Sequence, residues 1–155
     1  MTFNDLSLCV RKCRLPSSCY VMVPSPKDHT TFPPKGYVAI SPQHLEYGLR
    51  FPILPYLVDL LYDLKLSPCQ LTPNSYAQLT SLTIFFIKEG YSPFSPKIIK
   101  SLYSFKSVKD GLYYVRARPS DFKGLLSQGK AKGKSNVGDY KTHWFFISCS
   151  FLFSL

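Results

Sequence analysis

Acidic residues are scarce in this sequence, which has nine Asp and Glu against nineteen Lys and Arg and a formal net charge of +10. Hydrolytic nucleases and transposases hold catalytic metal ions with two or three carboxylates, so few residue sets here could do that chemistry. The one pair at helical spacing is Asp59 and Asp63, which we interpret as a solvated helix face. A metal-dependent nuclease is therefore the least favoured function class.

Long apolar runs are missing as well. No stretch reaches the roughly 20 apolar residues that a membrane-spanning helix needs, and no apolar segment follows a basic start, as it would in a secretory signal. We therefore expect an intracellular protein, in the nucleus or the cytoplasm, with no transmembrane span. The five cysteines are an odd number, so we expect reduced thiols and no disulfide framework.

Strong metal, nucleophile and phosphate motifs are absent too. Four residues could supply zinc ligands, but the paired C-x2-C knuckle of strong zinc motifs is missing; they are Cys9, Cys13, Cys19 and His29. The other two histidines have no Ser, Cys or Asp partner at a recognisable spacing. No glycine-rich phosphate cradle precedes a helical pattern. We expect a chain with no enzymatic activity, no resident metal and no cofactor.

A Ser-Pro or Thr-Pro step precedes three apolar-periodic runs. The hydroxyl can accept hydrogen bonds from free backbone N–H groups at a helix start, and proline fits the first helical position. The periodic runs predict helices that begin near Pro42, Pro55, Pro73 and Pro96. A further short helix is expected over 3–13, and the proline-rich segment 23–36 is expected to be an extended surface connection.

Strand patterns follow the helical part. "GLYYVRAR" at 111–118 alternates between two faces, and "THWFFIS" at 142–148 and "YVAIS" at 37–41 are further strand candidates. The segment 124–141 is rich in Gly, Ser and Lys, which predicts a mobile loop. We expect 111–118 and 142–148 to pair as an antiparallel hairpin around it. The fold class is α+β, with a mainly helical N-terminal and central part and a small antiparallel strand pair near the C-terminus.

The positive charge is concentrated after residue 95, where eleven Lys and Arg stand against three acids. Arg116 and Arg118 share a face of the predicted strand with Tyr114. The nearby loop adds Lys130, Lys132 and Lys134. Cations beside an aromatic ring suit single-stranded nucleic acid, RNA or DNA, through phosphate contact and stacking. The alternative is that Tyr114 is a core residue and the lysines only solvate a loop.

Several phrases in order resemble one plant family. They are "GLRFP" at 48–52, "LSPCQLTPN" at 66–74, "GLYYVRAR" at 111–118 and an aromatic strand that starts at Trp144. Together they resemble the gypsy-type transposon domain, also described as a gypsy-type transposase. The resemblance covers 10–148, leaving 1–9 as an N-terminal segment and 149–155 as an apolar stub. Family members continue into long helical regions, so this chain looks truncated at the C-terminus.

The resemblance implies descent from a retrotransposon and offers no catalytic residues to carry over. We expect a non-enzymatic module that binds nucleic acid or assembles with other element-encoded proteins. The alternative is a protein-interaction or vestigial domain with no nucleic-acid role. Within "GLRFP", Gly48 is expected to adopt a backbone conformation that other residues resist. Arg50 is expected to form a salt bridge with Glu46 or Asp59.

Overall fold

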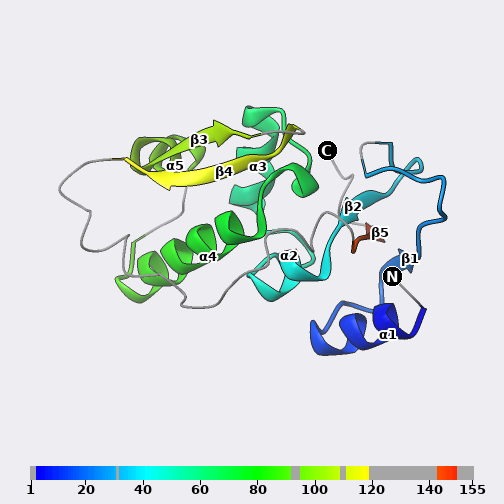
Figure 1. Ribbon diagram of the computed structural model, residues 1–155. Coiled ribbons are helices and arrows are strands. Elements are labelled where there is room, and N and C mark those ends of the chain that lie inside the picture. The colour runs from blue at the N-terminus through cyan, green and yellow to red at the C-terminus, as the bar shows by residue number, and fades with distance from the viewer. Residues whose placement is uncertain (1–2, 31, 92–94, 109–110, 119–142, 150–155) are drawn as a thin grey trace.

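The computed structural model describes residues 3–30, 32–91, 95–108, 111–118 and 143–149. Its helices are α1 (Phe3–Lys12), α2 (Pro42–Glu46), α3 (Pro55–Leu64), the 3-10 turn η1 (Pro68–Gln70), α4 (Pro73–Lys88) and α5 (Pro96–Leu102). Its strands are β1 (Cys19–Met22), β2 (Val38–Ile40), β3 (Tyr103–Ser107), β4 (Tyr113–Ala117) and β5 (Phe145–Cys149). Figure 1 shows β3, β4 and α5 at one end of the molecule and β1, β2, β5 and α1 at the other. The predicted α+β class is confirmed, as is the strand pair near the C-terminus.

The helix starts predicted from proline are confirmed, because α2, α3, α4 and α5 each begin at the proline that predicted it. At α5 the cap is formed by Ser95, whose Oγ accepts a hydrogen bond from the backbone N–H of Ile98 at 3.4 Å. The short N-terminal helix is also confirmed as α1. These elements depend on neighbouring residues alone, which is why the sequence predicts them well.

The predicted pairing of 111–118 with 142–148 is wrong. Strand β4 pairs with β3, while β5 lies between β1 and β2 in a separate three-stranded antiparallel sheet. Strands β1 and β3 were not predicted. The burial of β5 explains its place, because Phe145, Phe146 and Ile147 are all fully buried. A strand buried on both faces suits the centre of a sheet, where both edges are also covered.

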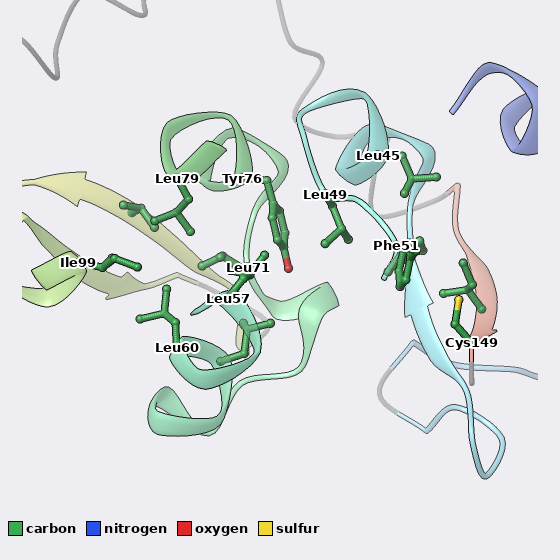
Figure 2. Packing of buried hydrophobic residues seen from close by; sticks show 14 of the residues in the cluster. Leu45, Leu49, Phe51, Leu57, Leu60, Leu71, Tyr76, Leu79, Ile99 and Cys149 are labelled. Atoms are coloured by element: carbon green, nitrogen blue, oxygen red, sulfur yellow. The ribbon is translucent and has the colours of Figure 1, made fainter. Parts of the chain in front are cut away.

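One apolar cluster extends from the central helices to β5. Figure 2 shows Leu57 and Leu60 of α3 facing Tyr76 and Leu79 of α4, with Leu49 on the path toward β2 and β5. All five are buried. The buried hydroxyl of Tyr76 donates a hydrogen bond to the carbonyl of Pro68 at 2.7 Å, so the ring fills the core without an unpaired polar atom. The two ends of the molecule therefore share one core.

The "GLRFP" phrase forms the turn that leaves α2. Gly48 has a φ of +111°, and a Cβ there would lie 2.5 Å from Oγ1 of Thr80 on α4. The conformation expected for Gly48 is thus confirmed. The salt bridge expected for Arg50 is wrong, because its guanidinium donates to the carbonyls of Leu45 and Leu49. Leu45 lies in the last turn of α2, and its carbonyl also accepts the backbone N–H of Gly48 at 3.2 Å.

The expectation of reduced thiols is wrong for two of the five cysteines. Cys19 and Cys149 form a disulfide between β1 and β5, with Cα atoms 4.3 Å apart and a sequence separation of 130 residues. The two residues stand opposite each other in the antiparallel register, so strand pairing itself brings them together. Cys9, Cys13 and Cys69 are free.

Candidate nucleic-acid interface

The β3–β4 hairpin has a buried face and an outer face. Tyr113, Val115 and Ala117 of β4 pack against the core cluster, as Tyr103 and Phe105 of β3 do. The alternate residues of both strands stand on the opposite face, because successive side chains in a strand alternate. There the register places Lys106 opposite Tyr114 and Ser104 opposite Arg116.

The outer face brings together a ring and two cations. Lys106 and Arg116 are exposed, and Tyr114 is half-buried without belonging to the core cluster. Directly opposed side chains in an antiparallel pair lie within about 5.5 Å at Cβ, so Lys106 and Tyr114 are neighbours across the hairpin. Tyr114 and Arg116 thus stand on one face of β4, whereas Arg118, predicted for the same face, follows the end of the strand at Ala117.

The edge of β4 that does not pair with β3 is held by residues at the start of α4 and just before it. The backbone N–H of Val115 donates to Oγ of Ser75 at 3.0 Å, and the N–H of Thr72 donates to the carbonyl of Tyr113 at 2.8 Å. Leu71 also forms an isolated parallel bridge with Tyr113. The hairpin is thus held in a fixed orientation, with its buried face against α4 and its outer face away from it.

Arg118 has a different role from Arg116. Its Nε–H is shared between the carbonyls of Lys100 at 2.9 Å and Tyr103 at 3.2 Å, at the end of α5. A cation near a helix C-terminus satisfies free carbonyls and interacts favourably with the helix dipole. Arg118 is exposed and adds positive charge at the end of the hairpin, but this side chain is tied to α5.

The structure adds one residue that sequence reasoning missed. Lys106 was overlooked because β3 follows α5 directly, with helix ending at Leu102 and strand beginning at Tyr103. The alternation of "YSFKS" was the signal that could have found it. The other predicted contact residues, Lys130, Lys132 and Lys134, lie outside the described residues, as does the loop predicted at 124–141.

His44 is the one histidine buried in the described part of the chain. Its Nδ1 accepts hydrogen bonds from the backbone N–H of Ser41 at 3.0 Å and from the Ser41 hydroxyl at 2.8 Å. Its Nε2–H therefore donates to the carbonyl of Leu71 at 3.0 Å. Burial lowers the pKa of His44 to about 4. This neutral imidazole joins the start of α2 to the segment beside β4 and has a structural role.

The metal alternatives gain no support from the residues that the structure describes. Within them, no group of three or more His, Cys, Asp or Glu side chains gathers to hold an ion. Asp63 of the carboxylate pair forms an ion pair with Lys100, while Asp59 is exposed. Cys19, one of the four candidate zinc ligands, is bonded to Cys149 and is not available as a thiolate.

No helix in the described ranges has both the length and the apolar character needed to cross a membrane. Comparison of the chain with protein-family models, with curated proteins and with solved structures finds no match.

Proposed function

We propose that this chain is a non-enzymatic module, derived from a transposable element, that binds single-stranded nucleic acid on the outer face of the β3–β4 hairpin. The observation that carries the proposal is the side-by-side placement of Lys106, Tyr114 and Arg116 on that face. Cations contact the phosphates of a flexible strand, and an aromatic ring stacks on a base of any sequence.

The composition of the hairpin supports the choice of ligand. Neither β3 nor β4 contains an acidic residue, and Arg118 adds a further positive charge where β4 ends. A net charge of +10 attracts a phosphate polymer over a longer range. Tyr114 is the aromatic residue of β4 that does not pack on the core cluster, whereas its neighbour Tyr113 does.

The test is binding of the purified chain to labelled single-stranded and double-stranded oligonucleotides over a salt series. The variant Lys106→Ala/Arg116→Ala removes two exposed cations from the outer face. For single strands, the slope of log K against log salt is expected to fall by about 0.7 for each phosphate that the protein no longer neutralises. The matched control is Lys27→Ala/Lys35→Ala, which removes two exposed cations from the connection between β1 and β2.

Stacking is tested at the same face. Tyr114→Leu should weaken single-strand binding roughly fivefold or more, while Tyr114→Phe should retain it, because a stacked ring contributes on the order of 1–3 kcal/mol. A folded chain that binds no oligonucleotide at low salt contradicts the proposal. Equal weakening in the hairpin variant and the control variant contradicts the assigned face.

A protein-interaction module with no nucleic-acid role is the second candidate. The observation in its favour is the C-terminal end of α4, where Ile84, Phe85, Ile87 and the following Tyr91 are all exposed. Exposed apolar side chains gathered at one place mark interaction sites in other proteins. This candidate gains if the chain binds no nucleic acid while Ile87→Asp changes its self-association in sedimentation.

A further inference from the structure

We propose that the Cys19–Cys149 disulfide is a redox-sensitive latch that holds residues 3–22, the α1–β1 arm, against β5. The bond crosses from the first strand of the chain to β5, 130 residues later. Reduction would leave the arm attached to the body only by non-covalent contacts, among them the β1–β5 pairing, and by the chain that continues from β1. This inference is independent of the nucleic-acid face.

The non-covalent hold on the arm consists of the β1–β5 strand pairing and of limited side-chain burial. Among the arm side chains that the structure describes, Leu6 and Cys9 are buried, Val10, Leu15 and Val21 are only partly buried against the core, and β1 contributes no fully buried residue. The ion pair of Lys12 with Glu46, at 2.6 Å, is exposed on both sides, and exposed pairs stabilise little. A segment with few buried contacts opens at a low free energy, independently of the rest of the fold.

The exposure of the two cysteines determines where a reductant attacks. Sγ of Cys149 belongs to a residue only 2% exposed, whereas Cys19 is partly exposed. A thiolate of a small dithiol attacks Sγ of Cys19, and Sγ of Cys149 leaves as a thiolate that takes up a proton. The second thiolate of the reductant then attacks the reductant sulfur that is bonded to Sγ of Cys19 in the mixed disulfide. That step releases Cys19 as a thiolate, which takes up a proton, and leaves the reductant oxidised as its own disulfide.

Cys9, a buried free thiol of the arm, is a poor candidate for attacking the bond. Burial, with Cys13 close by, raises the pKa of Cys9 to about 12. At neutral pH Cys9 therefore stays a thiol, and only a thiolate attacks a disulfide efficiently. Net reduction of the bond requires an external reductant in any case, because attack by a thiol of the same chain would only exchange one disulfide for another.

Release of the arm uncovers one edge of β5. In the sheet order β1-β5-β2, β1 is the strand that covers that edge. The backbone groups that now pair Cys19 through Met22 with Phe146 through Cys149 would become accessible. An uncovered edge is a template for pairing with another strand. Redox state would thus decide whether β5 is a central strand or an edge strand.

The experiment is limited trypsin digestion of the full chain, oxidised and after dithiothreitol, followed by mass spectrometry. Arg11, Lys12 and Arg14 place cleavage sites within the α1–β1 arm, and Lys88 at the end of α4 gives an internal reference. We expect reduction to speed cleavage at the arm sites at least tenfold relative to Lys88, and reoxidation to reverse it. Cys19→Ser should behave as the reduced chain in both conditions. Cys69→Ser, which removes a free thiol outside the latch, should behave as the wild type.

Three outcomes would overturn the proposal. The first is alkylation with mass mapping that finds Cys19 and Cys149 free in the chain purified without reductant. The second is a reduced chain whose arm is cleaved at the oxidised rate. The third is reduction that speeds cleavage at Lys88 as much as at the arm sites, because the disulfide would then stabilise the whole fold. Digestion of the oxidised, reduced and reoxidised wild-type chain tests the proposal even if Cys19→Ser fails to fold.

Discussion

The two sheets of this molecule are built in opposite ways. The β3–β4 hairpin joins neighbouring segments of the chain, buries one face and presents polar side chains on the other. The β1-β5-β2 sheet joins segments from both ends of the chain around a strand whose Phe145, Phe146 and Ile147 are fully buried. A disulfide is added there. The difference indicates that the β1-β5-β2 sheet mainly stabilises the fold, whereas the β3–β4 hairpin leaves one face available for contacts.

The largest expected effect contrasts one aromatic side chain from each sheet. Phe145→Ala in β5 should lower the free energy of unfolding by about 3–5 kcal/mol, because it removes a fully buried ring and leaves a cavity. Tyr114→Ala on the outer face of the hairpin should cost less than about 1 kcal/mol. Chemical denaturation of both variants measures the difference. Equal destabilisation would show that the outer face is as well packed as β5.

An intermediate effect is expected at the junction between the sheets. His44 is neutral in the fold with a pKa of about 4, against 6.5 when unfolded. The unfolded chain therefore binds the proton more readily, and stability is lost as pH falls from 6.5 to 4. The destabilisation from this group is about 3 kcal/mol, at 1.36 kcal/mol per unit. Unfolding measured across that range should show it, and the His44→Gln chain should show a flatter pH dependence. An unchanged pH dependence in the variant would assign the effect to other groups.

The smallest expected effect separates two arginines of the hairpin. Arg118→Ala should lower stability by about 1 kcal/mol, because the Nε–H no longer caps the carbonyls of Lys100 and Tyr103. Arg116→Ala should change stability by less than about 0.5 kcal/mol. Nucleic-acid binding should show the reverse order, with the greater weakening in Arg116→Ala. Thermal unfolding and the salt-series binding assay, run on the same two samples, provide the check.

Local signals predicted local structure. The helix starts at Pro42, Pro55, Pro73 and Pro96 depend on a proline and its neighbours, so they can be read from a few residues. Strand partners depend on the whole chain. The candidates at 111–118 and 142–148 lie near each other in sequence, yet β5 pairs instead with strands more than a hundred residues earlier. The cysteine pairing was missed for the same reason, because it follows from that register.

The candidate surface was predicted in part. Period-two alternation is a property of one strand, so it was enough to place Tyr114 and Arg116 on a common face. Lys106 required its partner strand, and β3 begins without any break after α5. The capping of α5 by Arg118 could not be predicted, since it depends on where the helix ends in space.

The position of β5 has a consequence for biosynthesis. Strands β1 and β2 leave the ribosome early, but the strand that must lie between them emerges more than a hundred residues later. At about 5–20 residues per second, both wait on the order of ten seconds for their partner. Meanwhile α3, α4 and the β3–β4 hairpin have all emerged and can begin to assemble. The nascent chain thus carries two unpaired strands for most of its synthesis, the period in which a chaperone that shields strand edges would matter most.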